Sequence, residues 1–270
     1  MRRFVIGGNW KMQVLTVGDA EKHTQNIATS IENINRVEVF IAPSFNSLIT
    51  VKKAIANSSL GLAAQNMHYL ERGAFTGQVS VLSLIDAGCN YVILGHSEPR
   101  RIFGESNKII NLKVLKALEY GLTVVLCIGE TAKEREDGLT TEINSSQLNE
   151  CLFEVSNKQL DKIIIAYEPV WAINNPYLNP GIEIKPATPD QAASAHKMIR
   201  EWIKNKYGHQ YGERIRIIYG GSMSERNARE LLMIEDIDGG LIGGASLTAE
   251  SFKPIIQIAE ELSKDIEDFR

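Results

Sequence analysis

Side chains that transfer protons or carry charge follow several short apolar runs of the chain. They are Asn9, Lys11, His96 and Glu168. A carboxylate and an imidazole can act as general acid or base, and an ammonium group stabilises negative charge that develops during a reaction. Residues of these types at the ends of apolar runs therefore predict a site for acid–base chemistry.

Two glycine pairs follow the last two apolar runs. Gly220 and Gly221 precede Ser222, and Gly243 precedes Gly244. Glycine lets the backbone approach a ligand closely, and N–H groups of loops at the ends of barrel strands commonly bind phosphate. Either pair alone would more often be an ordinary turn. Together they predict a phosphate site that includes Ser222, Gly243 and Gly244.

The elements that must position these residues are eight short runs rich in apolar and β-branched side chains. Their near-continuous hydrophobicity predicts parallel strands that are buried on both faces. The predicted strands are Phe4–Gly8, Val37–Ala42, Leu60–Gln65, Tyr91–Leu94, Thr123–Ile128, Lys162–Tyr167, Ile215–Tyr219 and Gly240–Ile242.

The segments between the runs carry apolar residues at helical spacing. Asn107–Tyr120 and Gln191–Tyr207 are two predicted helices, and Thr188 can form a capping box with Gln191 at the start of the second. Eight strands alternating with helices predict an α/β fold, a (β/α)8 barrel in a single domain over residues 1–270. The pattern alone also allows an open doubly wound sheet, but no dinucleotide-binding motif supports it. A barrel builds its active site at the carboxyl ends of its strands, where the polar residues occur.

Composition excludes several classes of function. The net charge of −4 leaves no broad basic face for nucleic acid or an anionic membrane. No apolar run approaches the length of a transmembrane helix, and the apolar stretch near the start is too short for a signal peptide, so we expect a cytoplasmic protein. Cys89, Cys127 and Cys151 lack metal-type or redox-type spacing and are expected to be reduced and buried. We expect no metal and no cofactor.

Eight short motifs, in order over essentially the whole chain, carry a resemblance to a known family. They are GNWKM at 8–12, AQN at 64–66, GAFTG at 73–77, GHSE at 95–98, FGE at 103–105, AYEPVWAI at 166–173, YGGS at 219–222 and GGASL at 243–247. These motifs resemble the triosephosphate isomerase family. The resemblance implies the barrel known as the TIM barrel. It also implies the cofactor-free interconversion of D-glyceraldehyde 3-phosphate and dihydroxyacetone phosphate in glycolysis and gluconeogenesis.

The resemblance also implies roles for the polar residues. In that family a carboxylate at the position of Glu168 removes a proton from the carbon next to the carbonyl group and returns it to the neighbouring carbon. A neutral histidine at the position of His96 donates a hydrogen bond to the carbonyl oxygen, and Lys11 is expected to stabilise the enediolate and the phosphate. Asn9 is expected to hold a substrate oxygen beside Lys11. His96 precedes a predicted helix start, whose free N–H groups disfavour an imidazolium.

The active-site lid departs from the family pattern. It spans about residues 169–187, and its tip, Asn174–Ile184, has eleven residues where the family has Gly-Thr-Gly. Counting from Ile173 makes Asn174 the candidate for the tip N–H that binds phosphate, with Gly181 as the alternative. Pro186 lies in the second hinge of the lid, residues 185–187, and its ring fixes one backbone torsion there. We therefore expect lid motion to differ from that of a short lid.

Other motif residues are expected to support the site or an interface. The supporting positions are Gln65, Asn66, Glu98, Glu105, Cys127 and Arg135. Thr76 lies on the long loop 66–77, which in the family reaches into a partner subunit, so the resemblance implies a homodimer. Pro99 stands where the family commonly has arginine, which predicts a rearranged ion-pair network around Glu98.

Two alternative functions remain open at this point. The same base, hydrogen-bond donor and phosphate site would serve an isomerase of a four-carbon ketose phosphate, and the longer lid could admit a longer substrate. A different class is a phosphosugar-binding barrel that has lost its chemistry. Rates on three-carbon and four-carbon phosphates, together with the activity of Glu168→Gln, distinguish the three.

Overall fold

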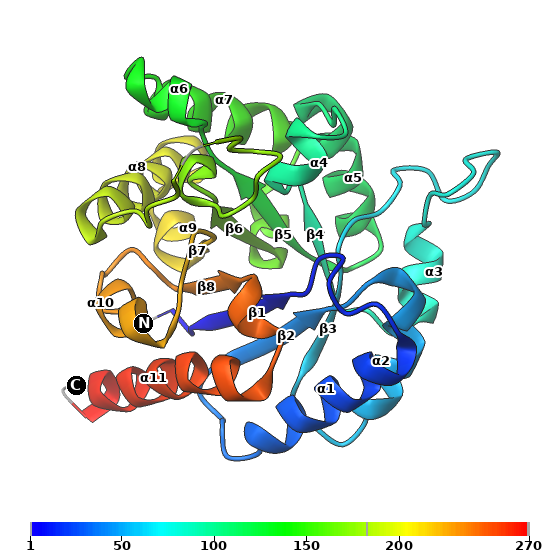
Figure 1. Ribbon diagram of the computed structural model, residues 1–270. Helices are drawn as coiled ribbons and strands as arrows, with labels where there is room; N and C mark the ends of the chain where they lie inside the picture. The colour runs from blue at the N-terminus through cyan, green and yellow to red at the C-terminus, as the bar shows by residue number, and fades with distance from the viewer. Residues whose placement is uncertain (1, 182, 269–270) are drawn as a thin grey trace.

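The computed structural model describes residues 2–181 and 183–268, and eight parallel strands close into a barrel within this part of the chain (Figure 1). Each strand pairs with the next along the sequence, and β1 pairs with β8 to complete the ring. The strands are β1 Val5–Asn9, β2 Glu38–Ala42, β3 Gly61–Ala64, β4 Tyr91–Leu94, β5 Thr123–Ile128, β6 Ile163–Tyr167, β7 Arg216–Tyr219 and β8 Gly239–Ile242. The predicted (β/α)8 barrel is confirmed, and the open doubly wound sheet is excluded.

The strand boundaries agree with the apolar runs to within one or two residues, and β4 and β5 agree at both ends. Nearly all residues of these strands are buried, as expected for a parallel sheet covered on both faces. The register places Val5 opposite Glu38 of β2 and opposite Gly239 of β8. Because all strands run in the same direction, their carboxyl ends open on one end of the barrel.

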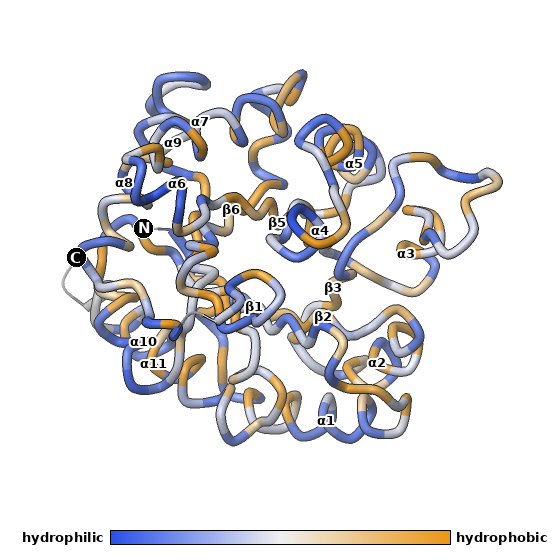
Figure 2. The backbone as a smooth tube through the Cα atoms, turned by 45° about the horizontal axis from the view of Figure 1, so that its top comes forward, coloured by the Kyte–Doolittle hydropathy of each residue, from blue (hydrophilic) through white to orange (hydrophobic). Residues whose placement is uncertain are grey.

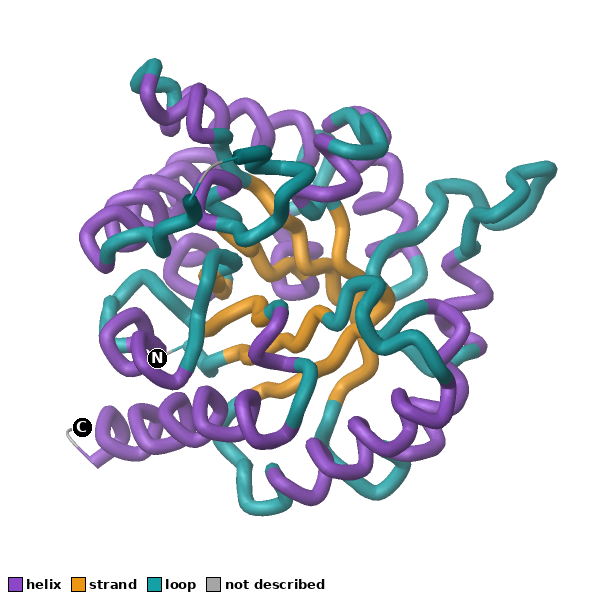
Figure 3. The backbone as a smooth tube through the Cα atoms, viewed as in Figure 1, coloured by secondary structure: helices purple, strands orange, loops and turns teal. Residues whose placement is uncertain are grey.

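Helices surround the barrel, and at least one α-helix lies between every two consecutive strands (Figure 3). The α-helices are α1 Val17–Ser30, α2 Leu48–Ala54, α3 Val81–Asp86, α4 Ser97–Arg101, α5 Asn107–Glu119, α6 Ala132–Glu136, α7 Thr140–Cys151, α8 Pro189–Tyr207, α9 His209–Arg214, α10 Glu225–Leu232 and α11 Ala249–Asp268. Short 3-10 helices are η1 Phe45–Ser47, η2 Asn157–Lys162, η3 Val170–Ala172 and η4 Gly244–Ser246.

Local signals account for two of the helices. Predicted helix Asn107–Tyr120 is α5, which ends one residue earlier, with Tyr120 as its C-cap. The capping box predicted for α8 is present: the Thr188 hydroxyl accepts the Gln191 N–H, and the Gln191 side chain accepts the Thr188 N–H. Pro189 occupies the first helical turn, where its missing N–H costs no intrahelical hydrogen bond.

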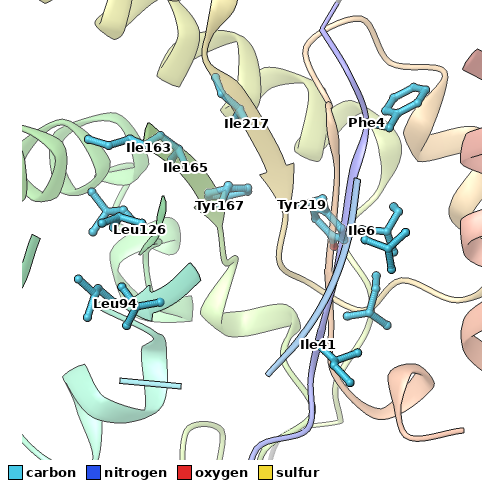
Figure 4. Close-up of a cluster of buried hydrophobic side chains, with 14 of the residues drawn as sticks. Phe4, Ile6, Ile41, Leu94, Leu126, Ile163, Ile165, Tyr167, Ile217 and Tyr219 are labelled. Atoms are coloured by element: carbon cyan, nitrogen blue, oxygen red, sulfur yellow. The ribbon is translucent and has the colours of Figure 1, made fainter. Parts of the chain in front are cut away.

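Alternation along each strand divides the core into two layers. An inner set fills the barrel and includes Val5, Phe40, Ile93 and Leu241. An outer set packs between the strands and the surrounding helices, and Figure 4 shows members of it from several strands, among them Ile6. Successive side chains of a strand point to opposite faces, so one run supplies both layers. Figure 2 shows the same division, with hydrophobic strands at the centre and helices that alternate between hydrophilic and hydrophobic positions.

Two long loops follow strands at the carboxyl end of the barrel. The loop between β3 and α3 projects away from the body of the molecule (Figure 1), and His68 stacks on Phe75 within it at 4.3 Å between ring centroids. The loop between β6 and α8 contains the predicted lid. Among the residues that the structure describes, no helix combines the length and apolar character needed to cross a bilayer.

Candidate active site

A cavity of about 330 Å³ opens at the carboxyl ends of the strands. It is lined by Asn9, Lys11, His96, Glu168, Ile173, Asn174, Gly220, Gly221, Ser222, Met223, Ser224, Leu241, Gly243, Gly244 and Ala245. Residues from β1, β4, β6, β7 and β8 or from the loops after them thus meet in one place, although they are far apart in the sequence. The cavity contains every candidate site residue of the sequence analysis except the alternative Gly181.

A larger depression, of about 1200 Å³, lies at the opposite end of the barrel, where the strands begin. Its arginines are engaged: Arg2 pairs with Asp238, Arg214 with Asp161 and Arg216 with Glu38. None of the candidate site residues lines it. The chemistry therefore belongs to the smaller cavity.

Glu168 is the acidic residue that lines the cavity, and only 2% of its surface is exposed. Its Oε1 lies 3.0 Å from His96 Nε2, and its Oε2 accepts the backbone N–H of Ser97 at 2.8 Å. Two glycines make room for it, because a Cβ at Gly129 would lie 1.7 Å from the Glu168 carbonyl oxygen and one at Gly220 would lie 2.7 Å from Glu168 Cγ. The close approach of β5 and β7 to the end of β6 fixes where this carboxylate stands.

The charge state of Glu168 follows from its partners. Burial raises the pKa of the carboxyl, but His96, the Ser97 N–H and the positive charge of Lys11 lower it by more. The net result is a pKa below the usual value of 4.5. Glu168 is therefore a carboxylate at neutral pH, as a general base must be.

His96 is held in one orientation by the start of α4. It occupies the N-cap position, and its Nδ1 accepts the backbone N–H of Glu98 at 3.2 Å. A ring nitrogen that accepts a hydrogen bond carries no proton, so the proton of the neutral imidazole is assigned to Nε2. Nε2 therefore donates toward Glu168 Oε1, and His96 can donate a hydrogen bond without being charged.

Lys11 has an unusual backbone conformation, with φ of 51°, which is rare for a residue with a side chain. Its N–H is accepted by Asn9 Oδ1 at 3.0 Å, and Gln65 Nε2 donates to its carbonyl oxygen at 2.8 Å. These bonds hold the turn after β1 and aim the long side chain at the cavity, where its Nζ lies 2.9 Å from Glu98 Oε1. Asn9 thus positions Lys11 and also lines the cavity itself.

Glu98 proves more central than its expected supporting role. Its Oε1 accepts from both Lys11 Nζ and Asn175 Nδ2. Burial raises the pKa of Glu98, whereas the Lys11 ammonium group and the Asn175 amide lower it. The network around Glu98 therefore includes an amide from the lid, which the sequence analysis did not identify.

The glycine-rich loops after β7 and β8 form one wall of the cavity. Ser222 Oγ donates to the carbonyl oxygen of Ala172 at 3.2 Å, which joins the loop after β7 to the first part of the lid. Gly243 precedes η4, whose Ser246 N–H and hydroxyl are both accepted by the Gly243 carbonyl. The wall presents backbone rather than bulky side chains, which suits a phosphate group.

Residues 174–181 of the lid tip form a folded turn. Asn179 Nδ2 donates to the carbonyl oxygens of Val170 and Ile173, at 2.8 and 2.9 Å. Of the two tip candidates, Asn174 lines the cavity and Gly181, although it has the positive φ of 70° typical of glycine, does not. The tip is therefore attached to the beginning of the lid by one buried asparagine.

Glu130 anchors the first part of the lid, and sequence reasoning missed it. Its side chain is fully buried and accepts from Tyr167, from the Trp171 indole and from Asn144. Arg135, expected to be a supporting residue, pairs with Glu130 at 3.3 Å and stacks over Trp171. An acidic residue two positions beyond the apolar run of β5 was the available signal.

Two of the other supporting residues, Asn66 and Glu105, contact each other. Asn66 donates to Glu105 Oε1, which also pairs with Lys113. Lys113 is almost fully buried, and the helical pattern of α5 gave no sign of that.

The cysteines are buried free thiols as expected, and burial raises the pKa of Cys127. Within residues 2–181 and 183–268, no cluster of three or more potential metal ligands occurs.

Comparison with known proteins agrees with the geometry. Residues 4–259 match the family model described as triosephosphate isomerase. The chain is 46% identical to the triosephosphate isomerase of Prosthecochloris aestuarii over 262 residues, 97% of this chain and 100% of that protein. It is 47% identical to the triosephosphate isomerase of Chlorobaculum tepidum, and the match covers 93% of this chain and 99% of that protein. It is 43% identical to the triosephosphate isomerase of Geotalea uraniireducens, and the match covers 96% of this chain and 100% of that protein. The chain belongs to the triosephosphate isomerase family.

Proposed function

We propose that the chain interconverts D-glyceraldehyde 3-phosphate and dihydroxyacetone phosphate, with Glu168, His96 and Lys11 as its catalytic residues. The observation that carries this proposal is the meeting of these three side chains at one cavity, with the Glu168 carboxylate 3.0 Å from His96 Nε2. The carboxylate supplies a base, the neutral imidazole a hydrogen-bond donor and the ammonium group a fixed positive charge.

The reaction needs each of these groups at a different atom. Glu168 takes a proton from the carbon next to the carbonyl group, and the electrons of that C–H bond form the double bond of the enediolate. The negative charge moves to the former carbonyl oxygen, where His96 Nε2–H and Lys11 stabilise it. Glu168 then returns the proton to the neighbouring carbon, while the hydroxyl proton passes between the two oxygens beside His96.

Glu168 must change partners during this cycle. Both of its oxygens accept hydrogen bonds in the structure, from Ser97 N–H and from His96. A carboxylate whose oxygens are occupied is a weaker base, so a bound substrate has to displace at least one donor. Residues 169–173 follow Glu168 directly and form the start of the lid, which couples this exchange to lid movement.

The phosphate group fits the glycine-rich wall of the cavity. Ser222, Gly243, Gly244 and Asn174 are its proposed ligands, and the Lys11 ammonium group supplies the positive charge. Asn9 completes the substrate site beside Lys11. We assign no cofactor or metal to the reaction, because proton transfer between neighbouring carbons needs no net oxidation.

The chain is proposed to act as a cytoplasmic homodimer, one (β/α)8 domain per subunit with an extended lid at about 169–187. Support for the dimer comes from the β3–α3 loop, which projects from the body of the molecule (Figure 1), and from exposed apolar side chains on this loop, on the loop after β1, on η1 and α2, on α3 and directly after α4. They are Met12, Leu15, Phe45, Ile49, Leu70, Phe75, Leu82, Ile85 and Phe103. Thr76 follows Phe75 in the same loop and is exposed.

A coupled assay of the purified protein on D-glyceraldehyde 3-phosphate tests the proposal, with Glu168→Gln as the matched variant. Loss of a general base lowers turnover by roughly 10²–10⁴-fold, and the amide fills the same space, so a folded but slow enzyme is expected. Greater activity on a tetrulose phosphate would reassign the substrate. Binding of a phosphorylated enediolate mimic without turnover of either substrate would contradict the catalytic assignment.

A further inference from the structure

The lid shares a hydrogen-bond acceptor with the catalytic lysine. Glu98 Oε1 accepts from Lys11 Nζ at 2.9 Å and from Asn175 Nδ2 at 2.8 Å. Asn175 belongs to the long tip of the lid, and Glu98 belongs to α4, which follows β4. One carboxylate oxygen thus joins the tip to the group that is to hold the substrate charge.

The orientation of the Asn175 amide is fixed by its own turn. Asn175 Oδ1 accepts the Tyr177 N–H at 2.9 Å, and its carbonyl oxygen accepts the N–H groups of Leu178 and Asn179. With Oδ1 committed to this turn, Nδ2 is the atom that faces Glu98. Pro176 restricts the backbone of Asn175 further, so the donor is presented with little freedom.

We propose that Asn175 is a positioning residue, which docks the lid on Glu98 and keeps that carboxylate partnered when the Lys11 ammonium group turns to the substrate. The inference rests on the proposed function, because it takes Lys11 as a substrate ligand. It adds a residue from the lid tip to those that govern substrate affinity.

Competition for Lys11 is the physical basis. A partly buried carboxylate such as Glu98 needs hydrogen-bond donors. When the Lys11 ammonium group moves to a substrate oxygen, the negative charge of Glu98 loses one of its donors. The Asn175 amide donates to the same oxygen and remains there while the lid is docked. Glu98 then holds Lys11 less strongly, and less free energy is needed to move the Lys11 ammonium group from Glu98 to an anionic substrate.

Two substitutions at this position separate positioning from a purely structural role. Asn175→Asp keeps the oxygen that accepts the Tyr177 N–H but sets a second carboxylate against Glu98, so two anions compete for Lys11. Asn175→Leu has a similar size and removes both polar contacts without adding charge. A residue that only maintains the turn would be harmed more by leucine, whereas a positioning residue would be harmed more by aspartate.

Steady-state kinetics on D-glyceraldehyde 3-phosphate measures the difference, with Tyr177→Asp as a charge-matched control. Tyr177 lies on the same tip and is 83% exposed, so its aspartate variant adds the same charge without facing Glu98. We expect the KM of Asn175→Asp to rise by about tenfold or more, that of Asn175→Leu by less, and that of Tyr177→Asp by less still. Turnover should change less than KM, because Glu168 and His96 keep their contacts.

Binding of glycerol 3-phosphate, measured by calorimetry, gives a second readout that needs no turnover. Its Kd should rise in the same order as KM. An equal or larger defect in Asn175→Leu, or a defect in Tyr177→Asp that equals that of Asn175→Asp, would overturn the inference. Inactivity of the unmodified protein on triose phosphate would instead count against the proposed function, and the binding series would still report on Asn175.

Discussion

His96 Nε2 and Glu168 Oε1 lie 3.0 Å apart, while the other ring nitrogen of His96 accepts the N–H of Glu98. The backbone of α4 therefore decides which nitrogen of the imidazole carries the proton. It directs that proton into the cavity, toward the Glu168 carboxylate. Position and tautomer of the histidine are both set by one short helix.

His96→Asn separates these two functions of the histidine. Asparagine is a good N-cap residue and can still accept an N–H at the start of α4, but it is too short to replace Nε2 beside the substrate. We expect turnover to fall by roughly 10²–10³-fold, the usual cost of one donor to a developing oxyanion. The temperature of unfolding should stay near that of the unmodified protein.

His96→Ala is the comparison that checks this interpretation. His96→Ala removes the N-cap as well. It should reduce activity about as much as His96→Asn does, and its free energy of unfolding should be lower than that of His96→Asn by roughly 0.5–2 kcal/mol. Urea denaturation of both variants measures the difference. Equal stabilities would show that Nδ1 does not contribute to the helix.

His196, which lies outside the site, should make stability depend on pH. It is fully buried, its Nδ1 lies 3.2 Å from the Asp236 carbonyl, and burial lowers its pKa to about 3. The unfolded chain binds the proton near pH 6.5 and the folded chain does not, so folding loses free energy as the pH falls below 6.5. The loss from this group is about 2 kcal/mol between pH 7 and pH 5.

His196→Asn removes this titration while keeping an amide donor for the Asp236 carbonyl. We expect urea unfolding of the variant to show a shallower fall in free energy between pH 7 and pH 5. The other titrating groups are common to both proteins, so the difference in slope isolates His196. Parallel curves would mean that the His196 imidazole binds its proton over the same pH range in the folded and unfolded states.

Thr76→Arg should weaken the proposed dimer. The loop that carries Thr76 projects from the barrel (Figure 1), and the neighbouring Phe75 is an exposed apolar residue, so a bulky charge at position 76 would be buried unpaired in the proposed interface. We expect sedimentation to show a shift toward the monomer and activity to fall with it. Lys253→Glu on the distant helix α11 is a control that should leave the assembly intact.

Replacement of residues 174–184 by Gly-Thr-Gly tests the role of the long lid tip. The shorter tip lacks the Asn175 and Asn179 contacts, so the lid should open and close faster and KM should rise. Turnover should increase if lid motion limits it, and its dependence on solvent viscosity should weaken. Unchanged turnover and KM would show that the insertion has no effect on lid function.

Much of the fold was determined by the sequence itself. Apolar runs such as 123–128 are buried on both faces and have few alternatives to a central parallel strand. For this reason the sequence predicts both the first and the last residue of β5 correctly. The positions of Glu168, His96 and Lys11 after their strands followed from the same pattern. In a barrel the end of every parallel strand leads to one rim, so these residues had to meet.

Contacts between loops were decided only by the tertiary structure. Three hydrogen bonds join segments that no sequence periodicity relates. The Ser97 N–H donates to Glu168, the Trp171 indole donates to Glu130, and the Asn175 amide donates to Glu98. A hydrogen bond depends on distances of a few tenths of an ångström and on which groups remain unpaired after packing. Strand patterns determined which residues reach the rim, and the packing of the loops determined which of them touch.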